Sequence, residues 1–243
     1  EALAVGTPVF AVAVNPLKFD ADNASLQKLG KILDLDIVAL RTLLSNNAHR
    51  GYLYLKRHVS WERMDEIRQL RLVHLRLEPE YRRYYPAGES TAHVVGLTDI
   101  DDMGLEGIEL AFESSLRGEA GNKTLLRDRE GRIVDDLDYG RAPRFGTDLQ
   151  LSIDSRLQYI AYRELKSAVQ GHGAKSGSLI MVDVKTGEIL ALVNQPSFNP
   201  NGPINQRSPN RNRVVTDFYD PGSTIKPFTA LAALESGLYQ SDS

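Results

Sequence analysis

The sequence contains no cysteine, so it can form neither a disulfide framework nor a cysteine-ligated metal site. It has no apolar stretch long enough to cross a bilayer, since the run from Pro8 to Val14 has the length of a buried strand. No signal-peptide pattern opens the chain. Because the first residues already belong to an apolar segment, we expect the natural N-terminus to lie further upstream.

Neither sign of charge dominates: 29 basic and 32 acidic side chains give a formal net charge of -3. A nucleic-acid-binding protein normally carries a concentrated basic surface, so we expect no nucleic acid partner. The five histidines are scattered, with no pair at metal-ligand spacing, and no glycine-rich phosphate loop is present. We therefore expect no metal and no cofactor.

The first half of the chain mixes strand and helix patterns. Apolar residues alternate in some segments and recur at helical spacing in others, and Asp36 and Ser60 stand where helix N-caps are expected. The predicted strands are residues 5–14, 52–57 and 73–77, with a hairpin over 124–136; the predicted helices are two within 22–46, one starting at Trp61, one through 93–95 and one over 104–116.

A short segment with proline and glycine, residues 141–146, separates this half from a differently patterned one. The second half predicts a strand over 149–153 and a helix that Asp154 caps and Gly171 ends. An apolar hairpin, residues 178–193, follows with its turn at 185–187, and then a long polar loop. We therefore expect an α+β fold in two parts, residues 1–146 and residues 147–243.

Ser223 and Lys226 are the candidate catalytic residues. Spacing of three on a helix puts them on one face, and the turn signal of residues 220–222 places Ser223 at the helix N-terminus. A serine hydroxyl needs an adjacent base to act as a nucleophile, and a lysine serves as that base when burial lowers its pKa. The helix after Lys226 is apolar nearly all round, which predicts that it lies inside the domain.

The Ser-x-x-Lys pattern alone is weak, since about one match is expected in a chain of this length. Ser25 and Lys28 form a second match, in an amphipathic helix with no apolar continuation. For Ser223 and Lys226, the plain alternative is an N-capping serine and a lysine that reaches water.

The longer motif is more specific. Residues 220–227 read Asp-Pro-Gly-Ser-Thr-Ile-Lys-Pro and closely resemble the active-serine motif of the class B penicillin-binding proteins. Residues 177–191 are similar to the first hairpin of that family, and residues 199–201 and 211–213 to the loop that follows it. Residues 82–86 and 104–109 resemble the non-catalytic pedestal domain of the cell-division (septal) members.

This resemblance implies a peptidoglycan D,D-transpeptidase, in which Ser223 forms an acyl-enzyme with D-Ala-D-Ala stem peptides or with β-lactams. One oxyanion donor would be the N–H of Ser223 itself. It also implies a periplasmic body held at the inner membrane by an N-terminal transmembrane helix that this chain lacks. A membrane glycan polymerase and other divisome proteins would be its partners.

The sequence departs from the family pattern after the serine, because neither Ser-x-Asn nor Lys-Thr-Gly follows Lys226. The tripeptides at 185–187 and 45–47 have the right letters but stand upstream, and we interpret 185–187 as a hairpin turn. We expect this chain alone not to turn over substrate.

Two other functions stay open. One is a β-lactam sensor or β-lactamase, against which the pedestal segment of residues 82–109 argues, because those proteins lack such a domain. The other is a non-catalytic scaffold that contacts divisome proteins. The Arg-Tyr cluster of residues 82–85 is either a packed junction or a contact surface for such a partner.

Overall fold

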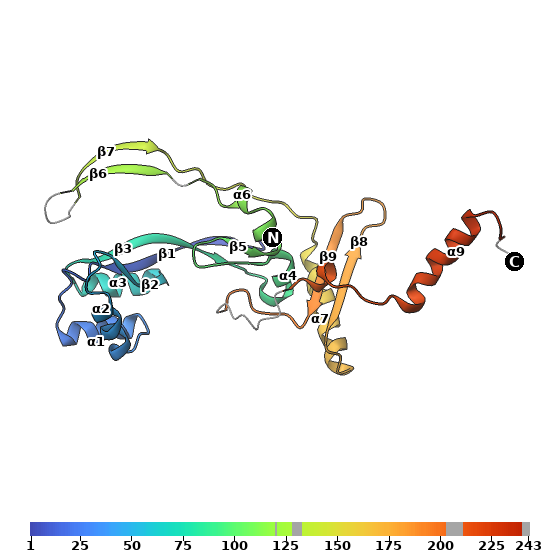
Figure 1. Cartoon of the computed structure of the whole chain (residues 1–243), viewed down its shortest axis with the longest axis horizontal. Helices are drawn as coiled ribbons and strands as arrows, with labels where there is room; N and C mark the ends of the chain where they lie inside the picture. The colour runs from blue at the N-terminus through green and yellow to red at the C-terminus, as the bar shows by residue number, and fades with distance from the viewer. Residues whose placement is uncertain (120, 128–132, 203–210, 240–243) are drawn as a thin grey trace.

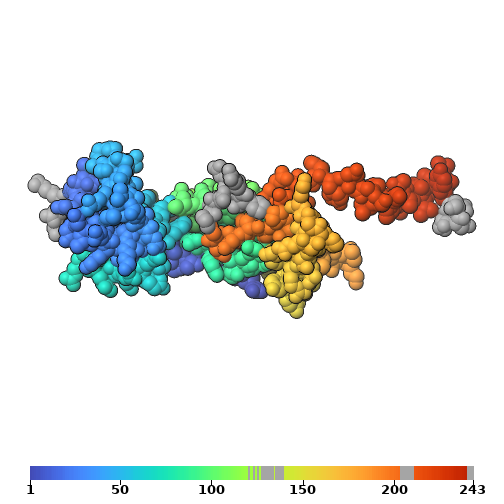
Figure 2. All heavy atoms as spheres, turned by 90° about the horizontal axis from the view of Figure 1, so that it is seen from below, coloured from blue at the N-terminus to red at the C-terminus, as the bar shows by residue number. Residues whose placement is uncertain are grey.

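The computed structural model describes residues 1–119, 121–127, 133–202 and 211–239. The molecule is elongated, with a head of strands and helices at one end and helix α9 projecting at the other (Figures 1 and 2). In the described residues, no helix combines the length and the apolar character needed to cross a bilayer.

The head is built on a three-stranded antiparallel sheet in which β1 (Val5–Val14) lies between β2 (Leu53–Val59) and β3 (Leu75–Tyr84). Every residue from 9 to 14 is buried. This is the burial expected of a central strand covered on both faces, and it explains the unbroken apolar run in the sequence. The strand predicted over 73–77 is present as β3, which begins at Leu75 and continues to Tyr84, well beyond the predicted end.

Three helices cover this sheet: α1 (Asn23–Ile32), α2 (Ile37–Asn46) and α3 (Trp61–Gln69). The Asp36 carboxylate accepts the N–H groups of Val38 and Ala39 at 2.9 and 3.1 Å, which confirms its predicted place as the N-cap of α2. The buried members of the shared core are Val12, Val14, Leu29, Leu33, Leu40, Leu53, Leu55, Val59 and Ile67.

The middle of the chain consists of short elements. They are η1 (Gly88–Ser90), α4 (Ala92–Val95), β4 (Leu97–Thr98), β5 (Gly104–Glu106), α5 (Gly107–Ala111) and α6 (Glu113–Leu116). The single helix predicted over 104–116 is wrong, because its first three residues pair with β4. Gly107 is the first residue of α5, and its own φ of 61° lies in the left-handed region that glycine adopts readily.

An antiparallel hairpin of β6 (Asn122–Arg127) and β7 (Ile133–Arg141) follows. Figure 1 shows it running in the same general direction as β1 and β3. The prediction of a hairpin in this region is confirmed, although its turn, residues 128–132, lies outside the described residues.

The second half is organised around helix α7 (Ser155–Gly171) and an antiparallel pair, β8 (Gly177–Val182) and β9 (Ile189–Gln195). Asp154 caps α7 as predicted, and the Arg156 guanidinium together with two main-chain N–H groups lowers the pKa of Asp154 to about 2. Residues on one face of α7 pack against the sheet. That core consists of Leu157, Ala161, Tyr162, Leu165, Leu179, Ala191 and Val193.

The strand predicted over 149–153 is wrong, because the structure forms no strand in these residues. Leu149, Leu151 and Ile153 are half-buried and line a cavity, while the residues between them are exposed. The segment has no strand partner. It is connected to β9 near its C-terminal end, where Ser152 Oγ donates to Ile189 O at 2.7 Å and the N–H of Asp154 donates to Leu190 O at 3.0 Å.

The last elements are α8 (Arg213–Thr216), the 3₁₀ turn η2 (Gly222–Ile225) and α9 (Lys226–Glu235). Residues between α8 and η2 lead away from the sheet, so α9 stands apart from α7, β8 and β9 (Figure 1).

Candidate active-site segment and its junction with the pedestal

Ser223 and Lys226 lie at the start of the last helix. Ser223 belongs to η2, and the main-chain N–H of Lys226 donates to Ser223 O. Side chains three residues apart eclipse one another in a 3₁₀ turn, so the hydroxyl and the ammonium project from the same side. Asp220 orders the entry to the turn, because its carboxylate accepts the N–H of Gly222 at 3.1 Å. In the described chain, no hydrogen bond joins the two side chains.

The helix that follows is not buried, contrary to the expectation from its apolar sequence. Phe228, Leu231 and Leu234 are 68%, 53% and 46% exposed, and Ser223 and Lys226 are exposed as well. The reason is that residues 217–221 carry α9 beyond the sheet, where no other described element packs against it (Figure 2). The low-dielectric surroundings expected around Lys226 are therefore absent from this structure.

The upstream tripeptide and tetrapeptide matches lie on elements other than η2 and α9. Ser25 and Lys28 lie on α1 in the head, at the opposite end of the molecule (Figure 1). Lys185 and Thr186 lie in the turn between β8 and β9, where the Asp183 carboxylate accepts both of their main-chain N–H groups at 2.8 and 3.0 Å. The interpretation of residues 185–187 as a hairpin turn is confirmed.

The Arg-Tyr cluster is a packed junction between the two halves. Arg82 donates to Asn201 O at 2.9 Å. The carboxamide of Asn201 pairs with both main-chain groups of Tyr85, accepting its N–H and donating to its carbonyl at 2.9 Å each. Tyr85 is buried, whereas Tyr84 remains half exposed. The loop after β9 is thereby fixed to the end of β3.

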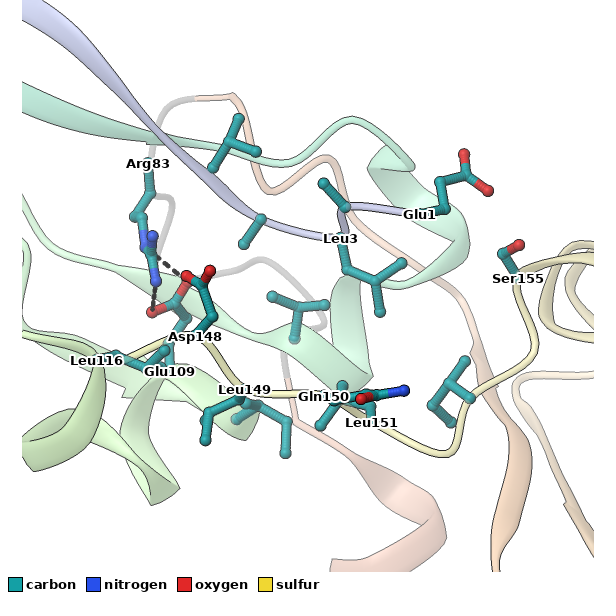
Figure 3. A pocket seen from close by; sticks show the side chains of 16 residues that line it. Glu1, Leu3, Arg83, Glu109, Leu116, Asp148, Leu149, Gln150, Leu151 and Ser155 are labelled. Carbon is teal, nitrogen blue, oxygen red and sulfur yellow. Dashed lines mark hydrogen bonds and ion pairs between the residues drawn. The ribbon is translucent and has the colours of Figure 1, made fainter. Parts of the chain in front are cut away.

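A cavity of about 660 Å³ lies where the head strands meet the middle segment. Figure 3 shows Arg83 directed toward Glu109 on its wall, with Asp148 beside the pair. Arg83 Nε lies 3.0 Å from the Glu109 carboxylate, which is 3% exposed. Burial raises the pKa of Glu109, and the Arg83 charge opposes that rise.

One junction residue was missed in the sequence. Gln158 of α7 is fully buried and donates to Ser90 O at 2.6 Å, which ties α7 to the pedestal. The available signal was a glutamine in line with Ala161 and Leu165, on the face of α7 that packs against the sheet. A polar residue at a core position of a helix requires partners, and here both halves of the molecule supply them.

Comparisons with known proteins agree with this arrangement. Residues 1–151 match the model of the penicillin-binding protein dimerisation domain, and residues 177–243 match that of the penicillin-binding protein transpeptidase domain. The chain is 42% identical to the probable peptidoglycan D,D-transpeptidase PenA of Neisseria meningitidis, over 97% of this chain and 41% of PenA. It is 39% identical to the peptidoglycan D,D-transpeptidase FtsI of Escherichia coli, over 99% of this chain and 42% of FtsI.

The chain thus spans about two fifths of the length of these curated relatives. A solved peptidoglycan synthetase from Bifidobacterium adolescentis shares the fold, with a TM-score of 0.62 and 22% identity, over 98% of this chain and 48% of that one. The match to the dimerisation domain alone takes in more than half of the sequence. The chain therefore belongs to the class B penicillin-binding proteins, the family of the peptidoglycan D,D-transpeptidases FtsI and PenA.

Proposed function

We propose that this chain is part of a septal peptidoglycan D,D-transpeptidase in which Ser223 is the nucleophile and Lys226 its partner. The observation that carries the proposal is the η2 turn, which presents both side chains from one side at the N-terminus of α9. The relatives named as D,D-transpeptidases support it across the whole chain.

The proposed chemistry is acyl transfer. Ser223 Oγ attacks the carbonyl carbon of the penultimate D-Ala and gives its proton to the unprotonated Lys226 amine. The tetrahedral oxyanion rests on main-chain N–H groups, one of them that of Ser223. Collapse breaks the peptide bond, and the departing D-Ala amine takes the proton. The amine of a neighbouring strand then attacks the ester carbonyl. It gives a proton to Lys226, which passes it to the departing Ser223 Oγ, so the cross-link forms and Ser223 is freed.

We propose that the exposed apolar side of α9 is covered by the later part of the transpeptidase domain. That part would also bring the Ser-x-Asn and Lys-Thr-Gly elements to Ser223. Burial of Lys226 beside Ser223 would follow from this packing. The exposure of Phe228 and Leu231 supports the proposal, since large apolar side chains on a helix normally face a core.

Substrates, partners and location follow from the family resemblance. The substrates would be peptidoglycan stem peptides ending in D-Ala-D-Ala, and β-lactams would acylate the same serine. The protein would act at the periplasmic face of the inner membrane, held by a transmembrane helix upstream of this chain, together with a membrane glycan polymerase and divisome proteins. We place the boundary between pedestal and transpeptidase domain at residues 141–146.

The test is intact-mass spectrometry after exposure to a penicillin. In a protein extended to the length of its relatives, one penicillin should add to the unsubstituted chain and to Ser25→Ala, but not to Ser223→Ala. Lys226→Ala should slow the addition by about a hundredfold or more, whereas Lys28→Ala should leave it unchanged. The 243-residue chain alone should show no adduct. An adduct that survives in Ser223→Ala would refute the assignment of the nucleophile.

A further inference from the structure

Two asparagines connect the sheet with the segment that leads to Ser223. Asn194 lies in β9 and is fully buried, and Asn212 stands immediately before α8. The Asn194 amide nitrogen donates to the Asn212 side-chain oxygen at 2.8 Å. Because Asn194 is fully buried, this pair has few alternative geometries, since most other arrangements leave an Asn194 polar atom without a partner.

The side-chain oxygen of Asn194 accepts two further hydrogen bonds. It accepts from Ser178 Oγ of β8 at 2.8 Å and from the main-chain N–H of Val214 in α8 at 3.0 Å. One carboxamide therefore fixes three elements relative to one another: both strands of the hairpin and the first turn of α8.

Asn212 extends the connection to the pedestal. Its amide nitrogen donates to the carbonyl of His93 in α4 at 3.2 Å. The main-chain carbonyl of Asn212 accepts the N–H groups of Val215 and Thr216, both at 3.1 Å, and these hydrogen bonds begin α8. Asn212 is the point at which pedestal, sheet and the segment leading to the nucleophile meet.

The pedestal end of this connection is itself packed. The His93 ring stands edge-on to Phe198, with centroids 5.2 Å apart, and Phe198 is buried with Ala92 and Leu97. Beyond α8, Arg211 pairs with Asp217 at 2.8 Å, so the first residues after the helix are also held. The contacts that begin at Asn212 therefore extend across α8 as far as Asp217, six residues before Ser223.

We propose that Asn212 is a positioning residue for the acylation of Ser223, which transmits the orientation of the pedestal to the segment carrying the nucleophile. The inference rests on the proposed acyl-enzyme function. Its basis is that one side chain satisfies both the pedestal carbonyl and the sheet asparagine, while its main chain starts the helix that leads to η2. Displacement of a reacting group by about 1 Å costs on the order of a hundredfold in rate.

The decisive variant is Asn212→Asp. The aspartate retains an oxygen for the Asn194 amide but loses the donor to His93 O and sets a negative charge against that carbonyl. Asn199→Asp is the matched control, because Asn199 accepts the N–H of Asn201 through its oxygen, which an aspartate keeps. Asn212→Ala, which removes the whole side chain, is the second variant.

Hydrogen exchange on this chain tests the connection. We expect Asn212→Asp and Asn212→Ala to raise exchange by at least about tenfold in residues 92–96 and in 213–217, with α1 and α2 unchanged. Asn199→Asp should match the unsubstituted chain. If exchange rises only in 213–217, Asn212 merely caps α8, and the inference is overturned.

Acylation by a fluorescent penicillin tests the consequence, in a protein extended to the length of its relatives. We expect the first-order acylation constant of Asn212→Asp to fall by about tenfold or more, with the dissociation constant of the initial complex and the number of titratable sites unchanged. The inference is overturned if Asn212→Asp has fewer titratable penicillin sites but an unchanged acylation constant. It is also overturned if the acylation constant is unchanged although hydrogen exchange is faster. If even the unsubstituted protein is not acylated, the proposed function fails, and the exchange data still decide whether Asn212 links the pedestal to α8.

Discussion

The Gln158 carboxamide pairs with both main-chain groups of Leu192. Its nitrogen donates to Leu192 O at 2.7 Å and its oxygen accepts from Leu192 N at 2.8 Å. These groups point away from β8, because alternate residues of a strand direct their N–H and C=O groups to opposite edges. A helix side chain therefore occupies the outer edge of β9 in place of a neighbouring strand.

Replacing Gln158 should lower stability strongly. Gln158→Ala leaves the N–H and C=O of the buried Leu192 and the carbonyl of the half-buried Ser90 without their partner, and we expect a loss of about 3 kcal/mol in the free energy of unfolding. Urea denaturation measures it. Gln170→Ala, at an exposed position of the same helix, should change stability by less than about 0.5 kcal/mol. Equal effects of the two variants would contradict the role of Gln158.

The Arg83–Glu109 pair predicts a second large effect. Arg83→Ala leaves the nearly buried Glu109 carboxylate without its counter-charge, and we expect a loss of about 3 kcal/mol. Arg68 provides the control, because it pairs with Asp65 at 3.8 Å on the exposed face of α3, and its replacement by alanine should cost less than about 0.5 kcal/mol. Thermal unfolding of both variants at neutral pH is the measurement.

The raised pKa of Glu109 predicts a pH dependence. The folded protein keeps a proton on Glu109 at a pH where the unfolded chain has lost it, so this group makes the free energy of unfolding fall as pH rises above its ordinary value of 4.5. Glu109→Gln does not titrate. We therefore expect the unfolding free energy of the unsubstituted chain, minus that of Glu109→Gln, to decrease from about pH 4.5 upward and to level off above the folded pKa.

Chemical denaturation at a series of pH values tests the sign. The decrease should be larger in an Arg83→Ala background, since the Arg83 charge opposes the rise of the Glu109 pKa. A difference that grows with pH would mean that the ion pair outweighs burial at this site.

Gly107 predicts a backbone effect. Its φ of 61° disfavours any side chain, and an added Cβ would lie 2.7 Å from the main-chain nitrogen of Gly96. We expect Gly107→Ala to cost more than about 2 kcal/mol. Gly171 ends α7 with open space around it, and Gly171→Ala should be neutral or stabilise by up to about 1 kcal/mol. Thermal denaturation compares the two alanine variants directly.

Sequence patterns predicted the elements whose signals are local. Asp36 and Asp154 mark helix starts, and the run ending at Val14 marks a buried strand, because capping and burial depend on neighbouring residues. The turn at 185–187 was recognised in the same way. The family, too, could be recognised from residues 220–227 together with the upstream segments.

Patterns failed where a distant partner decides the structure. Pro79 lies inside β3, which is possible because β3 is an edge strand and one of its sides needs no ladder donors. Residues 104–106 became a strand because residues 97–98 were available to pair with them. The sequence marks Gln158 as a polar residue on the packed face of α7, but it does not identify Leu192 as its partner, since that pairing depends on how α7 meets β9.

The separation of the head from the transpeptidase half gives the molecule the properties of a lever. The head core lies at one end of the long axis, and its connection to α7 and β9 runs through the compact junction around Tyr85 and Asn201 (Figure 1). A small rotation at that junction sweeps the head through a much larger arc than it moves β9. The distance between fluorescent labels on α2 and α7 would therefore change by more than the movement at the junction itself, and would reveal rotations that are too small to resolve there.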